Sequence, residues 1–367
     1  MSEKKKIKIC LIVNSLAKGG AEKVSAVLSN LFDAQGYEVF NVVFIDDVEY
    51  PFKGTLLNLG KIKNEKNDFF NKLKRLRALY DFVKTNHFDY IIDNRYLEHQ
   101  FQEFFLTKFV YSHAQYIRVV HSYRLRTYFP KNQFLAKHIY KNCRIVGVSQ
   151  AISDKVKQSL GYSDVTTIYN PIDIDKIREK SVELTPFNFP YIIGLGRMAQ
   201  DNVKQQDVMI KAYAQSHLKE KGIKLVLVGD GPRRVEFEDL VKELGLEQDV
   251  IFTGFQTNPF AYLKNALFTL LTSKHEGFPN AITESMACGT PVVSYNCKSG
   301  PDEVIIDKFN GLLVEDQNFE KLVEALNTLA EDQELYRKCK SNTLATAERY
   351  SLHQIASDWI KYLQKMK

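Results

Sequence analysis

The sequence predicts an α/β protein with two doubly wound domains, each a parallel sheet covered by helices on both faces. Short β-branched runs alternate with helical patterns along the chain, as in parallel sheets. The alternation restarts after Asn170-Pro171, so one block of strands precedes this point and a second follows it. A length of 367 residues also suits two domains better than one.

The first block is expected to supply residues 1–171. A buried strand at 7–13 is followed by a Gly-Gly turn and an amphipathic helix at about 21–35. The remaining buried runs of this block are expected to form strands at 39–45, 90–92, 116–120 and 144–149.

The second block is expected to supply residues 172–351, with a boundary near 171–188 where prolines interrupt regular structure. Its buried runs predict strands at 191–196, 223–229, 250–254, 267–272 and 291–295. The end of the chain, 352–367, predicts a helix that can pack back on the first domain. Its apolar side carries Ile355, Trp359, Tyr362 and Leu363.

The composition is that of a globular protein, with 44% hydrophobic and 26% charged residues. The cysteines are five in number and scattered, and no C-x-x-C pair occurs, which argues against a disulfide framework or a thiolate zinc site. The apolar run near the N-terminus is too short for a signal peptide, and no run is long enough to span a membrane. A cytoplasmic protein is therefore expected.

Charge is distributed unevenly between the two blocks. Residues 1–171 carry a net charge of +10, whereas 172–367 carry −4. A basic first domain is expected to face an anionic partner, such as a membrane surface, a phosphorylated lipid or a nucleic acid.

Two cations follow the first strand of the second block. Arg197 comes directly after the run YIIGLG, at the carboxyl edge where doubly wound sheets bind ligands, and Lys204 follows seven residues later. Together they could hold a diphosphate and stabilise it as it leaves, without a metal. Two solvated surface cations are the alternative.

The string HEGFPNAITESMACGTPVV, from His275 to Val293, lies between two buried runs. Gly277 and Pro279 predict a turn, and a helix is expected to open at or just after Asn280. Glu276 then lies in the turn and Glu284 one or two turns into the helix. Free N–H groups at the helix start lie between the two carboxylates and can bind hydroxyls or phosphate oxygens.

Glycines in the first block suggest a second phosphate contact. Gly19-Gly20 lies between a strand and a helix, where the backbone can approach an anion. An ordinary tight turn explains the pair equally well, and the dinucleotide fingerprint G-x-G-x-x-G is absent.

These motifs resemble glycosyltransferase family 4, retaining enzymes with the GT-B fold, including transferases of bacterial surface polysaccharides and lipid-linked glycans. The E-x7-E element matches Glu276 and Glu284. The other family elements occur in the expected order: GGAE (19–22), VSQAIS (148–153), YNPID (169–173), GLGR (194–197), VGDGP (228–232), FTGF (252–255), SGPDEVI (299–305) and NGLLV (310–314). The resemblance implies two Rossmann-like domains that face a central cleft.

The resemblance also implies roles for single residues. Arg197 and Lys204 match the diphosphate-binding pair, Glu276 the acid beside the donor sugar, and Glu284 the residue that holds the ribose hydroxyls. His121 matches a histidine near the transferred sugar, although by itself it reads as a structural histidine. The donor-binding backbone is assigned to Gly19, Gly20, Gly254, Phe278, Pro279, Asn280 and Ala281.

The sequence departs from the family pattern after Lys204, where Gln205 replaces the common glycine and the spacing from Arg197 is longer. No D-x-D metal motif is convincing, because Asp173-Ile174-Asp175 reads better as a helix cap. No metal or other cofactor is expected.

A basic amphipathic helix is predicted at about 67–85. Its apolar stripe carries Phe70, Leu73, Leu76, Tyr80 and Val83. Nearby cations are Lys72, Lys74, Arg75 and Arg77, with Arg118, Arg124, Arg126, Lys131 and Lys137 elsewhere in this half. The helix either packs its stripe on the sheet or rests on anionic lipid.

The expected function is transfer of a hexose or N-acetylhexosamine, most simply from a UDP-sugar, to a lipid-linked or lipid-core glycan. The protein is expected to act peripherally at the inner face of the cytoplasmic membrane. The alternatives are a transferase with a soluble acceptor, a sugar-phosphate epimerase, which the E-x7-E string disfavours, and a nucleic-acid-binding protein, for which no recognition motif occurs.

Overall fold

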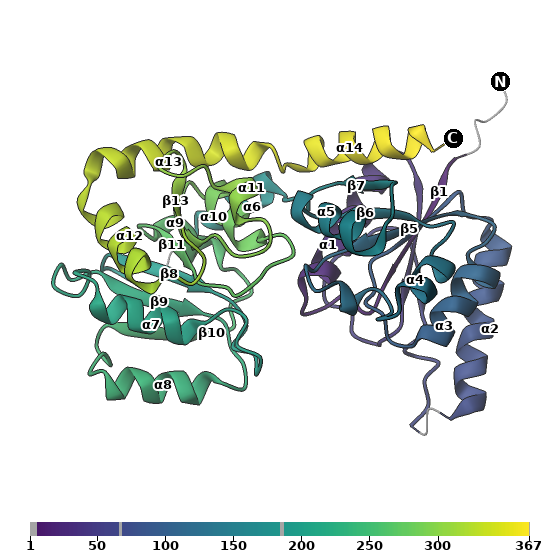
Figure 1. Ribbon diagram of the computed structural model, residues 1–367, viewed down its shortest axis with the longest axis horizontal. Coiled ribbons are helices and arrows are strands. Elements are labelled where there is room, and N and C mark those ends of the chain that lie inside the picture. The colour runs from purple at the N-terminus through teal and green to yellow at the C-terminus, as the bar shows by residue number, and fades with distance from the viewer. Residues whose placement is uncertain (1–5, 66–67, 184–186, 367) are drawn as a thin grey trace. The chain divides into compact units, whose positions relative to one another are not determined.

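The computed structural model describes residues 6–65, 68–183 and 187–366, and the chain divides into two compact units. Unit 1 comprises Met1–Pro171 and Ile355–Lys367, and unit 2 comprises Ile172–Gln354. Figure 1 shows the elements of both units. Each unit is a parallel sheet with helices packed against it.

The described part of unit 1 holds a seven-stranded parallel sheet in the order β3-β2-β1-β4-β5-β6-β7. At its centre β1 pairs with β2 on one side and with β4 on the other, so that Ile12 lies opposite Val42 and Asp93. The strands are β1 (Lys8–Val13), β2 (Glu38–Val43), β3 (Thr55–Asn58), β4 (Tyr90–Asp93), β5 (Gln115–Val120), β6 (Arg144–Gly147) and β7 (Val165–Thr167).

Two strands of this sheet were not expected from the sequence. β3 (TLLN) and β7 (VTT) are short, and both lie at the edges of the sheet, where half-exposed side chains give no continuous apolar run. The helical segments of unit 1 are α1 (Gly20–Ala34), α2 (Phe69–Asn86), α3 (Gln100–Phe105), η1 (Leu106–Val110), η2 (Leu125–Thr127), α4 (Gln133–Ile139), α5 (Gln150–Leu160) and α14 (Leu352–Lys365).

The C-terminal helix α14 packs on the first sheet, as Figure 1 shows for the yellow end of the chain. The Trp359 ring lies edge-on to Phe32 of α1 at 5.9 Å, and Tyr90 Oη donates a hydrogen bond to the Leu363 carbonyl at 2.8 Å. The side chains that the sequence places on one side of this helix, Ile355, Trp359, Tyr362 and Leu363, are all buried. A strongly amphipathic helix is stabilised mainly by such packing.

The described part of unit 2 holds a six-stranded parallel sheet in the order β10-β9-β8-β11-β12-β13. Its strands are β8 (Tyr191–Leu195), β9 (Lys224–Val228), β10 (Val250–Gly254), β11 (Thr269–Leu271), β12 (Val292–Tyr295) and β13 (Gly311–Val314). The last of these was predicted only as a family motif and not as a strand. Five expected strands of this block are confirmed.

Helices cover both faces of the second sheet. Helices α7, α8 and α12 pack against one another over a core that contains Met209, Phe237 and Leu326. Helices α6, α9, α10 and α13 pack against one another as a second layer. The helices are α6 (Ile174–Ser181), α7 (Gln206–Gln215), α8 (Arg234–Glu243), α9 (Phe260–Asn265), α10 (Asn280–Ala287), α11 (Pro301–Val304), α12 (Phe319–Glu331) and α13 (Gln333–Glu348). The Asp173 side chain caps α6 through the Lys176 N–H, as the sequence predicts.

None of the helices in the described ranges combines the length and the apolar character that a bilayer crossing requires.

Candidate active site

The strand order of unit 2 locates its ligand-binding edge. The chain runs from β8 outward through β9 to β10, then returns to the other side of β8 and runs outward through β11, β12 and β13. The order therefore reverses between β8 and β11, and ligands of doubly wound sheets bind beyond the carboxyl ends of the strands at such a switch point. The loops that follow β8 and β11 carry Arg197, Lys204 and Glu276.

Arg197 lies two residues beyond β8, with an exposed side chain that forms no ion pair with any other described residue. Its backbone is nevertheless fixed. The buried Gln206 side chain, at the start of α7, donates its amide to the carbonyls of Gly196 and Arg197, each at 3.3 Å. Arg197 is thus an unpaired cation on a restrained loop, which suits an anionic ligand.

Lys204 lies at the end of the same loop and forms an ion pair with Glu276. The distance from Lys204 Nζ to Glu276 Oε1 is 2.6 Å, and 26% and 11% of the two side chains is exposed. The Thr272 hydroxyl, just beyond β11, donates to the carbonyls of Lys204 and Gln205, each at 2.9 Å. The Lys204–Glu276 ion pair and the hydrogen bonds of the Thr272 hydroxyl therefore join the loop after β8 to the loop after β11, on either side of the switch point.

The residue after Lys204 explains one departure from the family pattern. Gln205 has a left-handed backbone with φ +49°, a conformation that glycine adopts at little cost. The positive φ at this position explains why a glycine is usual in the family. In this chain a glutamine adopts the same left-handed conformation.

The turn that carries Glu276 is held against the loop after β12. The Glu276 N–H donates to the Lys298 carbonyl at 2.9 Å, and the Ser299 hydroxyl donates to the Gly277 carbonyl at 2.8 Å. Gly300 has φ +99°, and a Cβ there would lie 2.6 Å from Pro279 Cδ. The glycine of the SGPDEVI motif thus lets the two loops approach.

Helix α10 opens at Asn280, as predicted, immediately after this turn. Phe278 and Pro279 are buried, with the Phe278 ring 5.2 Å from the Tyr350 ring, while Asn280 and Ala281 are half-buried. At the start of α10 the Asn280 N–H donates to the Phe278 carbonyl and the Ile282 N–H to the Pro279 carbonyl, each at 2.9 Å. The turn and the helix start are therefore held together beside Glu276. Glu284 follows on the fifth residue of the helix and is half-buried.

Gly254 ends β10 with φ +72°, at a shift in the register with β9. Its carbonyl accepts a hydrogen bond from the Gly229 N–H at 2.9 Å. Gly254 therefore lies at the carboxyl edge of the sheet, as the donor assignment requires. Two strands, β9 and β8, separate it from β11 in the sheet order.

In unit 1 the strand order reverses between β1 and β4. Gly19 precedes α1 in an extended conformation, and Gly20 is the first residue of that helix. A Cβ at Gly19 would overlap Glu22 Oε2, so the carboxylate of the GGAE motif lies over this glycine. Burial raises the pKa of Glu22.

His121 follows β5 at the same edge and is held by Asn94, which follows β4. His121 Nε2 lies 2.8 Å from Asn94 Oδ1, and Nδ1 is buried without a hydrogen-bond partner in the described chain. Burial, together with the nearby Arg118 charge, lowers the pKa of His121 to about 3. His121 is therefore neutral near pH 7 and donates Nε2–H to Asn94.

A buried charge network lies beneath this edge. Arg95 Nη2 lies 2.6 Å from Asp93 Oδ2, and Arg118 Nη1 lies 3.0 Å from the same oxygen and 3.2 Å from Glu103 Oε1. Burial favours the neutral form of Asp93, but the charges of Arg95 and Arg118 outweigh it and hold its pKa below the usual value. The expectation that Arg118 adds to the basic surface is wrong, because its side chain is fully buried and paired with carboxylates.

The basic helix also differs from the expected stripe. Val83 is buried, but Phe70 is 79% exposed and Leu73 is 51% exposed. In the first turn of α2 the buried side chain is Asn71, which donates to the Ile62 carbonyl at 2.8 Å. Arg75 is half-buried and its Nη2 donates to the Phe44 carbonyl at 2.8 Å. Of the four clustered cations, Lys72, Lys74 and Arg77 are exposed, and Arg77 is paired with Asp81 at 2.8 Å.

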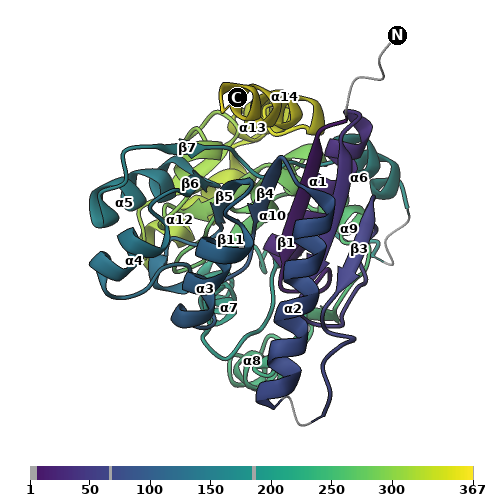
Figure 2. The same ribbon diagram turned by 90° about the vertical axis from the view of Figure 1, so that its right-hand side faces the viewer.

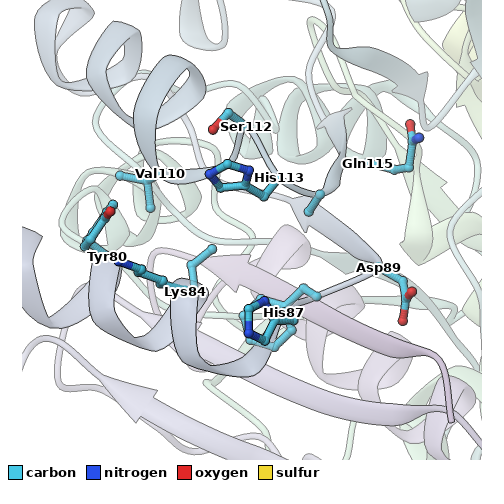
Figure 3. A pocket seen from close by; sticks show the side chains of 11 residues that line it. Tyr80, Lys84, His87, Asp89, Val110, Ser112, His113 and Gln115 are labelled. Carbon is cyan, nitrogen blue, oxygen red and sulfur yellow. The ribbon is translucent and has the colours of Figure 1, made fainter. Parts of the chain in front are cut away.

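Two hollows of unit 1 lie at opposite edges of its sheet. The larger, about 640 Å³, is lined by residues that precede β4 and β5 and by the end of α2; in Figure 3, Tyr80, Lys84 and His87 lie across it from Ser112 and His113. It is at the amino edge, away from the switch point. The smaller, about 340 Å³, lies at the carboxyl edge between α2 and α3.

The structure thus brings together the predicted residues Arg197, Lys204, Glu276 and the start of α10 on adjoining loops of unit 2, while Gly19, Gly20 and His121 belong to unit 1. The sequence did not single out the residues that fix these loops. They are Thr272, Gln206, Ser299, Gly300 and Asn94, which act through backbone carbonyls or close packing. Of these, only Ser299 and Gly300 fall in a motif, SGPDEVI, that the sequence marked.

Comparison with known proteins agrees with this fold. Residues 175–345 match the family model "Glycosyl transferases group 1", which covers most of unit 2. HepE of Anabaena, solved in complex with UDP-glucose, superposes with a TM-score of 0.77 at 22% identity, over 98% of this chain and all of the HepE chain. The protein is a glycosyltransferase with the GT-B fold.

Two sequence relatives are bacterial transferases. The N-acetylgalactosamine-N,N'-diacetylbacillosaminyl-diphospho-undecaprenol 4-alpha-N-acetylgalactosaminyltransferase of Campylobacter jejuni is 28% identical over 97% of this chain and 99% of its own. The lipopolysaccharide 1,6-galactosyltransferase of Salmonella typhimurium is also 28% identical, over 52% of this chain and 54% of its own. This chain is similar to both.

Proposed function

We propose that the protein is a retaining glycosyltransferase that moves a hexose or N-acetylhexosamine from a UDP-sugar to a saccharide on a lipid carrier or lipid core. The observation that carries the donor half is the Lys204–Glu276 ion pair, which joins the two loops that diverge from the switch point of unit 2. The UDP-glucose complex of HepE and the diphospho-undecaprenol acceptor in the name of the Campylobacter relative support the choice of substrates.

Each site residue has a role in this reaction. Arg197 and Lys204 face the diphosphate, whose negative charge grows as the bond to the sugar breaks, so the cations bind the transition state more strongly than the ground state. Glu276, held by Lys204 at 2.6 Å, faces the sugar, and Glu284 faces the ribose. The turn from Phe278 to Ala281 contacts sugar hydroxyls through backbone N–H groups, which Pro279 lacks, and the backbone at Gly19, Gly20 and Gly254 contacts the donor.

A metal is not part of this proposal. Two cationic side chains can neutralise a leaving diphosphate, which is the contribution that a divalent ion makes in other transferases. We propose that His121, neutral near pH 7, contacts the transferred sugar as a hydrogen-bonding group and not as a cation.

The acceptor half is assigned to unit 1, which we propose rests on the inner face of the cytoplasmic membrane. The support is its net charge of +10 over residues 1–171, with the exposed aromatic and basic side chains at the start of α2. Lys72, Lys74 and Arg77 are exposed next to Phe69 and Phe70, a combination typical of helices that bind anionic lipid.

The test is a donor panel in excess chelator. UDP-, GDP- and ADP-sugars are compared for thermal stabilisation and for slow donor hydrolysis. A UDP-sugar at about 100 times its dissociation constant should add about 2.7 kcal/mol of stability and be hydrolysed. The proposal fails if no nucleotide sugar stabilises the protein or is hydrolysed. A GDP- or ADP-sugar preference changes the donor only, and hydrolysis that requires added magnesium contradicts the metal-free route.

A further inference from the structure

The hollow between α2 and α3, here called the α2–α3 groove, has a volume of about 340 Å³, at the lower end of the range of about 300–1,000 Å³ for small-molecule sites. Figure 2 shows α2 and α3 next to each other on unit 1. The apolar lining comes from Leu73, Leu76 and Leu79 of α2, Leu106 of η1, and Phe44 and Leu59 of two loops. Such a surface suits a hydrocarbon chain.

The groove lies at the carboxyl edge of the unit 1 sheet. Phe44 directly follows β2, Leu59 directly follows β3, and Glu98 lies in the loop after β4. Glu98 Oε1 accepts a hydrogen bond at 3.1 Å from the Asn14 side chain, which directly follows β1. One end of the groove is therefore connected to the switch point between β1 and β4, where a doubly wound sheet binds its ligand.

Two cations line the groove, together with the carboxylate of Glu98 and the polar side chains of His99 and Gln102. Lys72 is exposed, and Arg75 is half-buried with its Nη2 hydrogen-bonded to the Phe44 carbonyl at 2.8 Å. Arg75 Nε is buried and has no acceptor among the described residues. A buried donor without a partner is costly, and a phosphate oxygen is the acceptor that a guanidinium binds best.

Exposed apolar side chains surround the groove. The ring centroids of Phe69 and Phe70, at the start of α2, lie 5.9 Å apart, and the two residues are 73% and 79% exposed. Phe101 on α3 is 92% exposed. A cluster of exposed aromatic rings among cations is typical of surfaces that meet the lipid interface. A chain that leaves the bilayer at this rim enters the groove without crossing water.

We propose that the α2–α3 groove binds the hydrocarbon chain of an isoprenyl diphosphate, the lipid carrier of the acceptor, with Lys72 and Arg75 facing its phosphates. This inference rests on the proposed lipid-linked acceptor. The apolar lining selects a chain and the two cations select an anionic head group. The groove thereby holds the carrier at the edge of the sheet where the acceptor saccharide is needed.

The probe is farnesyl diphosphate, kept below its micelle concentration and titrated calorimetrically into the full-length protein without vesicles. Inorganic diphosphate and farnesol test the head group and the chain separately, and dihexanoyl phosphatidylglycerol stands for an ordinary membrane lipid. Farnesyl diphosphate should bind at least tenfold more tightly than any of the other three. If inorganic diphosphate binds as tightly as farnesyl diphosphate, the groove does not bind the hydrocarbon chain. If phosphatidylglycerol binds more tightly than farnesyl diphosphate, the assignment to an isoprenyl carrier is wrong.

Matched variants locate the binding. Leu73→Gln and Leu76→Gln each remove an apolar side chain from the groove and should weaken farnesyl diphosphate binding about tenfold or more. Phe134→Gln removes an 86% exposed ring on α4 that does not line the groove and should leave the affinity unchanged. If both leucine variants bind like the wild type, or if Phe134→Gln loses as much affinity as they do, the groove is not the site.

Folding and the proposed function have separate readouts. Trp359 is the single tryptophan and is buried in unit 1, so its emission reports whether each variant keeps that unit folded. UDP-sugar binding and hydrolysis report the donor site in unit 2. Donor hydrolysis without farnesyl diphosphate binding defeats the groove proposal alone, whereas farnesyl diphosphate binding without any donor turnover defeats the proposed transferase reaction.

Discussion

Arg197 and Lys204 share one loop but have different surroundings. Lys204 is neutralised by Glu276 at 2.6 Å, whereas Arg197 is exposed and unpaired within the described chain. When the donor diphosphate enters, Arg197 can give its full charge to it, while Lys204 divides its charge between the phosphate and Glu276. We therefore propose that Arg197 is the main electrostatic contact for the leaving group.

Substituting Arg197 should affect turnover more than donor binding. Arg197→Ala removes a cation whose partner gains charge only in the transition state, so kcat should fall about 10²-fold or more with a much smaller change in KM. Steady-state kinetics with a saturating acceptor measures both constants. Arg337→Ala, an exposed arginine on α13, is the matched control and should be silent. An Arg197→Ala enzyme with near-normal kcat takes Arg197 out of the diphosphate site.

The two glutamates of the E-x7-E element should respond differently to removal of their charge. Glu276 lies in the turn and contacts Lys204, whereas Glu284 lies more than one turn into α10. Glu276→Gln should lower kcat, because it disturbs the sugar and the Lys204 charge together. Glu284→Gln should mainly weaken UDP affinity, measured by calorimetry with free UDP. Equal losses of UDP affinity in both variants contradict this division.

His121 should make unit 1 less stable as the solution becomes acidic. Its folded pKa is about 3, against 6.5 for an unperturbed histidine, so only the unfolded chain takes up this proton as pH falls below about 6.5. The free energy of unfolding should then decrease toward pH 3, by up to about 1.4 kcal/mol per pH unit from this group. No contribution is expected above pH 7.

The His121 contribution can be isolated by comparing the wild type with His121→Gln. Urea unfolding followed by Trp359 emission reports unit 1 at pH 7.5, 6.0 and 5.0. The wild type should lose more stability than the variant between pH 6.0 and 5.0. Parallel pH profiles show that the histidine titrates normally and is not buried in its neutral form.

Single residues of the site differ in how well the sequence predicts them. Arg197, Glu276 and the start of α10 follow from their places after buried strands, because the carboxyl edge of a parallel sheet is a property of the pattern. The pairing of Lys204 with Glu276 does not follow, because 72 residues separate them and the contact depends on which strands are neighbours. The same holds for Asn94 and His121.

At the scale of elements, β4, β5 and α3 are joined by the network of Asp93, Glu103, Arg95 and Arg118. The sequence shows Asp93 and Arg118 only as charges beside apolar runs, so the network is hidden until β4 and β5 pair at Asp93 and Arg118. The register places the two side chains together, and α3 contributes Glu103. Every charge in the set has an opposite partner, which offsets the cost of burial.

Breaking this network should be strongly destabilising. Arg118→Met leaves Asp93 and Glu103 buried with Arg95 as their single cation, and should reduce the free energy of unfolding of unit 1 by about 3–5 kcal/mol. Urea unfolding monitored through Trp359 measures the loss. Arg126→Met, at an exposed site in the same half, should change stability by less than about 0.5 kcal/mol. Similar losses in both variants indicate a general effect of removing positive charge.

The sequence predicted most of the buried strands and missed two half-exposed ones. Strands such as β1 and β9 are continuous buried runs and were expected, whereas β3 and β7 are short edge strands with half-exposed side chains. In α2 the 3.6-residue period predicts a helix but not the depth to which each turn is buried. Phe70 and Leu73 satisfy the period and are exposed, whereas the polar Asn71 is the buried side chain of the first turn and donates to the Ile62 carbonyl.

For the molecule as a whole, charge separates the two units more clearly than fold does. Both units are parallel sheets with a switch point, but residues 1–171 and 355–367 of unit 1 together carry +12, whereas residues 172–354 of unit 2 carry −6. Burial of Arg118 leaves this asymmetry in place, because Lys72, Lys74 and Arg77 remain exposed beside Phe69 and Phe70. The asymmetry therefore supports different partners for the two units.

Unit 1 should bring the protein to vesicles that contain anionic lipid. Each exposed lysine or arginine near such a surface contributes roughly 1 kcal/mol, and screening over about 8 Å at physiological salt keeps the binding weak and reversible. In cosedimentation with phosphatidylglycerol vesicles, the bound fraction should fall as salt rises. Changing Lys72, Lys74 and Arg77 together to Gln should reduce it severalfold, whereas changing Lys211, Lys219 and Lys338 of unit 2 should not.

The aromatic side chains at the start of α2 add a separate test. If Phe69 and Phe70 enter the interface, a fraction of the protein should stay bound at high salt, because apolar burial is not screened. Changing both to Ser should remove that fraction and leave the salt-sensitive binding. A protein that ignores anionic vesicles even at low salt shows that the charge of unit 1 serves another anion. A phosphorylated, water-soluble acceptor would then replace the lipid-linked one.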